Sequence, residues 1–232
     1  MKLGIFTDSH YSSQEVTCGN RYNSKSLAKI REAVSFFEAE GCDLAVCLGD
    51  LIDREADHGK EQANLWEAGS VFAASPLRVV CVMGNHDGFA FTQEEFYAIL
   101  GKRCLPETVY AEGKTLIFLD ACYLTSGRHY APGDHDWEDT FLPDTEGLKN
   151  ALSAAKGEVY IFLHQNLDPN IPENHAVKNR AEVLQILKEN GRVKAVFQGH
   201  YHPGTECLWE GIRFCTFPAM CERDGARFVL EI

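Results

Sequence analysis

Five short motifs along this chain combine acidic, amide and imidazole side chains, which are groups that bind divalent metal ions in proteins. In chain order they are Asp8-Ser9-His10, Gly49-Asp50-Leu51-Ile52-Asp53, Gly84-Asn85-His86-Asp87, the lone His164, and Gly199-His200-Tyr201-His202. No single motif is diagnostic, but the ordered set offers enough ligands for two metal ions. Two such ions could activate a water molecule for hydrolysis.

The first two motifs offer carboxylates at positions suited to cations. Asp8 and His10 are one residue apart, so in an extended backbone both side chains point the same way and can bind one ion. Taken alone, that pair is typical of a solvated turn. Asp50 follows a buried strand, where an unpaired carboxylate is costly, and its two oxygens can bridge two ions. Asp53 could cap the next helix or hold a ligand in place.

The third motif divides its side chains between binding and catalysis. Asn85 offers a neutral carbonyl oxygen to a metal, although Gly-Asn sequences also favour tight turns. We expect His86 to stay off the metals and Asp87 to orient it, because a carboxylate partner stabilises an imidazole as a cation. His86 is therefore the candidate catalytic acid, with Asp87 assisting it.

The two histidine motifs lie in the second half of the chain. His164 ends an apolar run, and a lone histidine at a strand end is by itself more often structural. Gly199 permits a tight exit from a strand, and the i, i+2 spacing of His200 and His202 can aim both imidazoles toward adjacent metals. The last motif is therefore the more specific of the two.

The positions of the motifs relative to the expected elements decide between these alternatives. Apolar runs predict strands, several of them covered on both faces, at residues 3–7, 43–48, 78–83, 115–119, 158–163 and 193–197. Helical spacing predicts helices over residues 24–40, with Ser24 as N-cap, and over residues 179–190. Each motif follows a strand, and residues past the carboxyl ends of parallel strands converge on one crevice.

The remaining segments are expected to form hairpins and loops. Residues 204–209, 213–217 and 227–232 read as antiparallel strands joined at Glu210-Gly211 and Asp224-Gly225, and residues 109–118 as a hairpin. Residues 11–23 and 123–144 lack periodicity, which indicates functional or mobile loops. Residues 133–137 could cover a substrate or hold another ion, although an acidic loop without metal is favoured. We expect His58, His129 and His175, which match no motif, at the surface.

Composition restricts the classes of partner. The 232 residues, 45% of them hydrophobic, fit one α/β domain spanning residues 1–232. A net charge of −12 without a basic run argues against nucleic acid as a partner. Nine cysteines without a C-x-x-C pair predict reduced thiols, and the lack of a signal peptide or an 18-residue apolar run predicts a cytoplasmic protein without a membrane anchor. The sequence gives no indication of the oligomeric state.

The ordered pattern D-x-H, G-D-x-x-D, G-N-H-[DE], H and G-H-x-H resembles the calcineurin-like metallophosphoesterase superfamily. The resemblance implies a four-layer αββα sandwich, in which helices flank two mixed β-sheets and a dimetal site lies at the carboxyl edge of the strands. It assigns one metal to Asp8, His10, Asp50 and His202. It assigns the other to Asp50, Asn85, His164 and His200.

The resemblance also implies a reaction. Two cations roughly 3.5 to 4 Å apart would generate a bridging hydroxide that attacks phosphorus in line, while His86 protonates the leaving oxygen. The mixed ligands suit Mn²⁺, which we favour, as well as Fe or Zn²⁺. The motif ending in Asp87, together with Arg21-Tyr22 and Ser26-Leu27, resembles manganese-dependent ADP-ribose/CDP-alcohol diphosphatases and related phosphodiesterases more than it resembles Ser/Thr protein phosphatases.

The expected substrate is a small phosphoester. A phosphodiester or pyrophosphate of nucleotide type is favoured, with Arg21 pairing with a phosphate and Tyr22 stacking on a base. An ordinary surface loop is the alternative for these two residues. Two alternative functions are a catalytically silent binding scaffold, which the complete ligand set disfavours, and a nuclease, which the acidic balance disfavours.

Overall fold

The first β-sheet carries three of the five motifs. The computed structural model describes residues 1–232, and its first sheet has the strand order β12-β1-β2-β3. The strands are β1 (Lys2–Phe6), β2 (Leu44–Cys47), β3 (Val79–Cys81) and β12 (Phe228–Glu231). β1, β2 and β3 are parallel, whereas β12 is antiparallel to β1. Almost every residue of the three parallel strands is buried, which explains their continuous apolar sequences.

The second β-sheet carries the two histidine motifs. Its strand order is β10-β11-β9-β8-β5-β4, with parallel pairing from β11 to β5 and antiparallel pairing at both edges. The bounds are β4 (Val109–Ala111), β5 (Lys114–Phe118), β8 (Glu158–Phe162), β9 (Val193–Gln198), β10 (Thr205–Trp209) and β11 (Ile212–Thr216). A separate two-stranded pair, β6 (Tyr123–Leu124) and β7 (Thr140–Phe141), lies within the segment expected to be irregular.

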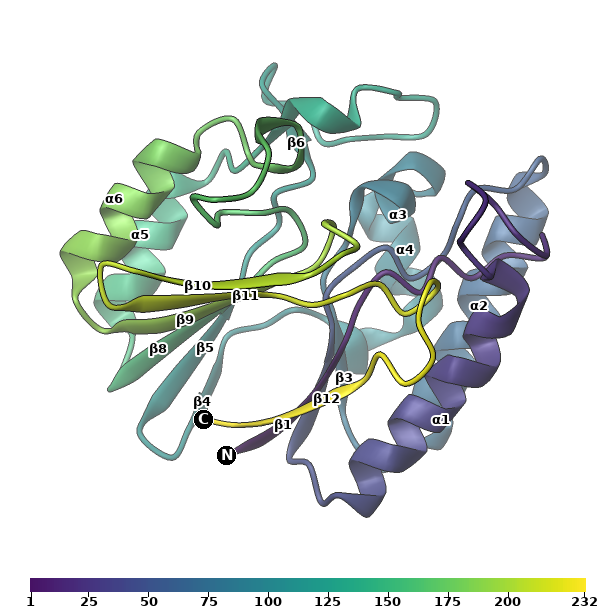
Figure 1. Ribbon diagram of the computed structural model, residues 1–232, viewed down its shortest axis with the longest axis horizontal. Coiled ribbons are helices and arrows are strands. Elements are labelled where there is room, and N and C mark those ends of the chain that lie inside the picture. The colour runs from purple at the N-terminus through teal and green to yellow at the C-terminus, as the bar shows by residue number, and fades with distance from the viewer.

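Helices cover the outer face of each sheet, which confirms the predicted arrangement of two mixed sheets flanked by helices (Figure 1). The first sheet is covered by α1 (Ser26–Ala39), α2 (His58–Ala74) and α4 (Gln93–Leu100). The second sheet is covered by α5 (Thr145–Ala154) and α6 (Arg180–Asn190). The short helix α3 (Asn85–Ala90) begins within the third motif. Short 3-10 turns occupy Asn23–Lys25, Lys102–Cys104, Trp137–Asp139 and Glu173–His175.

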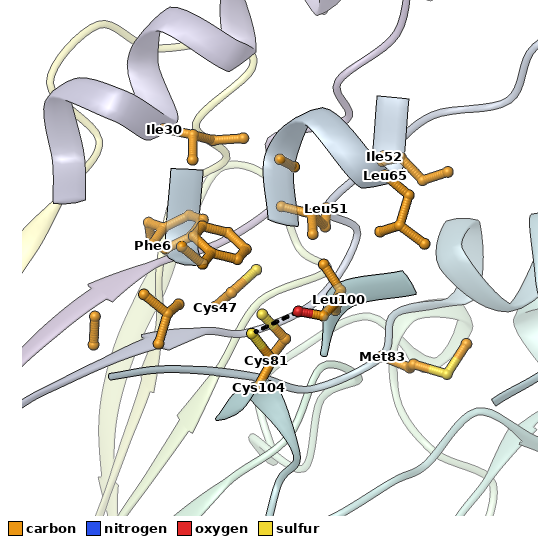
Figure 2. Close-up of a cluster of buried hydrophobic side chains, with 14 of the residues drawn as sticks. Phe6, Ile30, Cys47, Leu51, Ile52, Leu65, Cys81, Met83, Leu100 and Cys104 are labelled. Atoms are coloured by element: carbon orange, nitrogen blue, oxygen red, sulfur yellow. Dashed lines mark hydrogen bonds between the residues drawn. The ribbon is translucent and has the colours of Figure 1, made fainter. Parts of the chain in front are cut away.

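Three clusters of buried apolar side chains hold the two sheets and their flanking helices together. Between the sheets, Phe118 and Phe162 stack at 4.9 Å between ring centroids. Between the first sheet and its helices, Phe6 belongs to a buried cluster that includes Ile30 and Leu51 (Figure 2), and its ring centroid lies 6.5 Å from that of Phe37. Cys47 and Cys81 are completely buried there and behave as small apolar side chains, in agreement with their sequence context. All nine cysteines are free thiols.

Two local predictions were wrong. Ser24 does not cap α1, because a 3-10 turn from Asn23 to Lys25 leads into the helix and no side chain caps it. The last two strands are not joined as a hairpin, because β12 crosses to the first sheet and pairs with β1. The connecting segment is bound to the end of β1, since the N–H groups of Met220 and Cys221 donate to the carbonyls of Thr7 and Asp8, both at 3.0 Å.

The lengths and sequences of the helices can be compared with the thickness of a bilayer. None of them is long and apolar enough to cross a bilayer.

Candidate metal centre

The five motifs meet at one edge of the molecule. Asp8 lies two residues beyond β1, Asp50 three beyond β2, Asn85 four beyond β3, and His164 and His200 two beyond β8 and β9. Because the parallel strands of both sheets end at this edge, short extensions bring all five motifs together. Asp8, Asp50, Asn85, His164 and His200 are all buried.

One group of ligand atoms gathers around Asp8 and His10. Asp8 Oδ1 lies 3.7 Å from His10 Nε2 and 3.4 Å from His202 Nε2. The two imidazole nitrogens are 3.2 Å apart, and Asp50 Oδ2 lies 3.5 Å from His10 Nε2. Asp8 Oδ2 accepts hydrogen bonds from the Thr7 hydroxyl and the His200 N–H, which leaves Oδ1 directed at the two imidazoles.

A second group of ligand atoms gathers on the other side of Asp50. His164 Nε2 lies 3.3 Å from Asp50 Oδ2 and 3.2 Å from Asn85 Oδ1. Ligand atoms of Asp50, His164 and His200 all lie within 4.8 Å of one another. Asp50 Oδ2 is therefore close to both groups, while its Oδ1 accepts the backbone N–H of His86 at 2.8 Å.

The donor atoms fit divalent cations. Asp8 Oδ1 and His200 Nε2 are buried without a hydrogen-bond partner, and two imidazole nitrogens face each other in the first group. Unpartnered buried polar atoms are costly, and a cation bound in each group would satisfy them. The combination of carboxylate, imidazole and amide ligands suits Mn²⁺, Fe or Zn²⁺.

Neighbouring charges set the protonation states of three of these residues. Burial raises the pKa of Asp50, but the His164 and His86 imidazoles outweigh burial and hold this pKa well below its usual range. Burial lowers the pKa of His164, but Asp50 outweighs burial and raises it to about 10. Burial and the neighbouring His86 lower the pKa of His10 to about 4. Asp50 is thus anionic and His10 neutral, the forms that bind cations, whereas His164 is protonated and must release a proton before its Nε2 can bind an ion.

The backbone at this edge adopts conformations that side chains rarely allow. The φ angles are positive at Asp8 (50°), His10 (44°), Asp50 (50°) and His200 (67°). Gly84 passes so close to Asp50 that a Cβ atom there would lie 2.1 Å from Asp50 Oδ1. Such strained residues cluster at functional sites, where the surrounding fold holds them in place.

His86 lies beside the two groups of ligand atoms but makes other bonds. Its Nδ1 is 2.8 Å from Asp53 Oδ1, and its Nε2 is 3.5 Å from an Arg21 guanidinium nitrogen. Burial lowers the pKa of His86, but Asp50 and Asp53 outweigh burial and raise it. Although His86 lies within 4.8 Å of ligand atoms of His10 and Asp50, the Arg21 cation beside Nε2 disfavours a further cation there.

The prediction that Asp87 orients His86 was wrong. Asp87 Oδ1 accepts the backbone N–H groups of Leu51 and Ile52 at 3.0 and 3.2 Å, and Oδ2 accepts that of Gly84 at 2.9 Å. Burial and the Asp50 carboxylate raise the pKa of Asp87 to about 7. Asp87 points into the fold because α3 begins at Asn85, so it joins the second and third motifs while Asp53 orients His86.

A cleft of about 550 Å³ opens over these residues. Arg21 and His86 line one part of it, and Trp137, His175 and Tyr201 line another. The His175 ring lies 5.1 Å from that of His200 and 5.5 Å from that of Trp137. The aromatic rings therefore form a wall next to the second group of ligand atoms.

Comparison with known proteins identifies the family. A family model described as calcineurin-like phosphoesterase matches residues 1–204. The chain belongs to the calcineurin-like phosphoesterase family. Members of this family use two divalent metal ions, in agreement with the two groups of ligand atoms that share Asp50.

Individual relatives of this chain are distant. A probable cyclic nucleotide phosphodiesterase from Fibrobacter succinogenes is 25% identical over 218 residues, covering 87% of this chain and 73% of the relative. The DNA double-strand break repair protein Mre11 of Nanoarchaeum equitans is 23% identical over 229 residues, covering 86% of this chain, which spans only 57% of that protein. A dimetal phosphatase structure from Danio rerio superposes with a TM-score of 0.82 at 19% identity, covering 96% of this chain and 88% of that one.

The remaining sequence predictions have mixed outcomes. Arg21 lines the cleft, 3.8 Å from Asp53, whereas Tyr22 does not line it and has the Lys25 ammonium 4.9 Å from its ring centre. His58 is exposed as expected, but His129 is half-buried and pairs with Asp120.

Three residues near the site were missed. His175 was expected at the surface but lines the cleft, and no motif marks it. Glu222 hydrogen-bonds to His202 Nδ1, and the Cys221 sulfur lies within 4.8 Å of ligand atoms of His10 and His202. Both come from the crossing between the sheets, which the sequence did not predict.

Proposed function

We propose that this phosphoesterase hydrolyses a small phosphodiester or pyrophosphate of nucleotide type with two divalent cations, Mn²⁺ being favoured. Asp8, His10, Asp50 and His202 would hold one ion, and Asp50, Asn85, His164 and His200 the other. The observation that carries the proposal is the convergence of these side chains on Asp50, whose Oδ2 lies within 3.5 Å of His10 Nε2 and His164 Nε2.

The residues around the cations would divide the remaining work. When bound, the two ions would polarise the phosphoryl group and supply the nucleophile from water at neutral pH. His86 would donate a proton from Nε2 to the leaving oxygen, with its ring held by the Asp53 hydrogen bond. Arg21 would bind a phosphoryl oxygen, since its guanidinium lines the cleft beside His86.

Several features favour a small substrate. The cleft volume of about 550 Å³ suits a single nucleotide-sized ligand. The rings of Trp137, His175 and Tyr201 could stack on a base, as aromatic side chains do in nucleotide sites. The net charge of −12 disfavours a nucleic-acid backbone as substrate, because such binding depends on basic surfaces.

A phosphoester panel tests this function. The purified chain is treated with chelator, reconstituted with Mn²⁺, and assayed on bis(p-nitrophenyl) phosphate, a cyclic nucleotide, ADP-ribose, a simple monoester and single-stranded DNA. We expect Mn²⁺-dependent hydrolysis of a diester or pyrophosphate, abolished in Asp50→Asn. Cleavage of DNA in preference to the small diesters would assign a nuclease instead, and no hydrolysis in any metal-loaded sample would favour a binding scaffold.

A further inference from the structure

A second, smaller cavity lies beside the main cleft. It has a volume of about 180 Å³ and shares Asn85, His86 and Trp137 with the cleft. Its other walls, which do not line the cleft, are the side chains of Arg54, Phe89, Tyr130 and His135. We call this cavity the side pocket. Because His86 borders both spaces, a substrate bound at the metal edge could extend into either one.

The backbone fixes two walls of the side pocket relative to His86. Phe89 lies three residues after His86 on α3, so both side chains project from adjacent turns. The backbone N–H of Arg54 donates to Asp53 Oδ1 at 2.8 Å, and the same oxygen pairs with His86 Nδ1. The Arg54 guanidinium in turn lies 4.4 Å from the centre of the Phe89 ring. Movement of the pocket relative to His86 would break these contacts.

The opposite walls come from the segment between β6 and β7, which lies over the same end of the sheets as α3 (Figure 1). Tyr130 is buried against Gly88, where a Cβ atom would lie 3.3 Å from the Tyr130 carbonyl oxygen. The Tyr130 hydroxyl donates to the Asp134 carbonyl at 3.0 Å, and Arg128 binds both Asp134 carboxylate oxygens at 2.7 Å. His135 and Trp137 therefore project from an ordered loop.

The side pocket is lined by aromatic rings and by one arginine, Arg54, that has no carboxylate partner. Phe89, Tyr130, His135 and Trp137 supply four rings, a composition typical of sites for planar groups. Arg21 lies 3.8 Å from Asp53, whereas Arg54 has no carboxylate oxygen within 4.0 Å. The Arg54 donors are thus free for acceptor atoms on a ligand.

We propose that the side pocket binds a planar aromatic ring of the leaving group, with Arg54 donating to acceptors on that ring. This inference rests on the proposed function, in which His86 protonates the leaving oxygen. It identifies the substrate class as esters whose leaving alcohol or phosphate carries a base-like or aryl ring. The retained half of the substrate would then occupy the main cleft against His175 and Tyr201.

Two chromogenic diesters separate the two binding spaces. Bis(p-nitrophenyl) phosphate and methyl p-nitrophenyl phosphate release the same p-nitrophenolate and differ only in the retained group. Phe89→Leu should raise KM for both substrates by about ten-fold, since base stacking on an aromatic ring contributes that much or more, and should leave kcat nearly unchanged. Phe89→Tyr keeps a ring and should restore the wild-type KM. Arg54→Gln should also raise both KM values.

The matched control lies in the main cleft. Tyr201→Leu should raise KM more for bis(p-nitrophenyl) phosphate, whose retained group is a ring, than for methyl p-nitrophenyl phosphate. Two outcomes would overturn the inference: an unchanged KM for methyl p-nitrophenyl phosphate in Phe89→Leu, or a rise in KM in Tyr201→Leu that is as large for methyl p-nitrophenyl phosphate as for bis(p-nitrophenyl) phosphate. Circular dichroism of each variant checks that it folds.

A binding measurement keeps this inference separate from the catalytic proposal. In a Trp66→Phe, Trp209→Phe background, the fluorescence of Trp137 reports binding of bis(p-nitrophenyl) phosphate without turnover, because nitrophenyl groups quench indole emission. If the protein hydrolyses no diester, the proposed function fails, but quenching that weakens about ten-fold in Phe89→Leu still supports the side pocket. If quenching is the same with and without the Phe89→Leu substitution, the result contradicts the side pocket whether or not hydrolysis occurs.

Discussion

The metal edge and the walls of the two substrate spaces are built differently. We use metal edge for the seven proposed ligands, Asp8, His10, Asp50, Asn85, His164, His200 and His202. They follow strands β1, β2, β3, β8 and β9 within a few residues, and most are completely or almost completely buried. The walls come from loops and from α3, and several of their side chains, such as Arg54 and His135, are exposed.

This difference separates the reaction from its specificity. Strand ends hold the metal edge in place, because each ligand lies within a few residues of a paired strand. The walls depend on tertiary contacts such as the Arg128–Asp134 ion pair at 2.7 Å and the packing of Tyr130 on Gly88. Changes at the metal edge should therefore abolish turnover, whereas changes in the walls should alter which substrate is preferred.

The largest effect is expected at Asp50. Asp50→Asn removes the charge shared by both groups of ligand atoms, so Mn²⁺-dependent hydrolysis of bis(p-nitrophenyl) phosphate should fall below detection. Asp224→Asn, at an almost fully exposed aspartate, is the matched control and should retain full activity. Activity within a few-fold of wild type in Asp50→Asn would show that the metal edge is not where turnover occurs.

The next effect is expected at His86. His86→Gln keeps a hydrogen-bonding side chain but cannot supply a cationic proton donor, so kcat should fall roughly 10²-fold or more while bound metal is retained. Metal content is measured by inductively coupled plasma spectrometry on the same samples used for kinetics. Unchanged kcat would remove His86 from the mechanism, and loss of metal would make it a ligand instead.

Substitutions at Asp53 and Asp87 distinguish a carboxylate that orients His86 from one that stabilises the fold. Asp53→Asn should lower kcat by tens of fold through His86, a typical cost of losing an orienting carboxylate. Asp87→Asn should instead reduce the free energy of unfolding by about 1 to 3 kcal/mol. Both carboxylate oxygens of Asp87 accept hydrogen bonds from backbone N–H groups, whereas an Asn side chain has only one acceptor oxygen. Urea unfolding and kinetics on both variants check the contrast. The opposite pattern would restore Asp87 as the partner of His86.

The smallest effect is expected at Glu222. Glu222→Gln replaces the carboxylate that holds His202 Nδ1 with a neutral amide. Affinity for Mn²⁺ should therefore fall about ten-fold, with little change in kcat at saturating metal. Titration of activity against free Mn²⁺ measures this shift. An unaltered titration curve would limit Glu222 to a role in packing.

The sequence predicted the metal edge better than its surroundings, for physical reasons. Buried parallel strands have continuous apolar sequences, so residues such as Asp50 and His164 could be placed just past strand ends before any contact was known. The partner of His86 could not be read from neighbouring positions, because the start of α3 turns Asp87 inward and a different loop brings in Asp53.

The walls left weaker signals in the sequence. His175 reaches the cleft only because the loop after β8 folds back beside His200, a contact that no local pattern encodes. Glu222 depends on the crossing of the chain from the second sheet to the first, where an antiparallel hairpin seemed the simpler connection. Tyr22, in the irregular loop of residues 11–23, was expected to stack on a base, yet it lies outside the cleft.

Anomalous diffraction from crystals grown with Mn²⁺ tests the central claim most directly. If two cations bind at the metal edge, the map will contain two peaks, both within coordination distance of Asp50, one beside His10 and His202 and the other beside Asn85 and His164. A single peak, or peaks that do not share Asp50, would contradict the account.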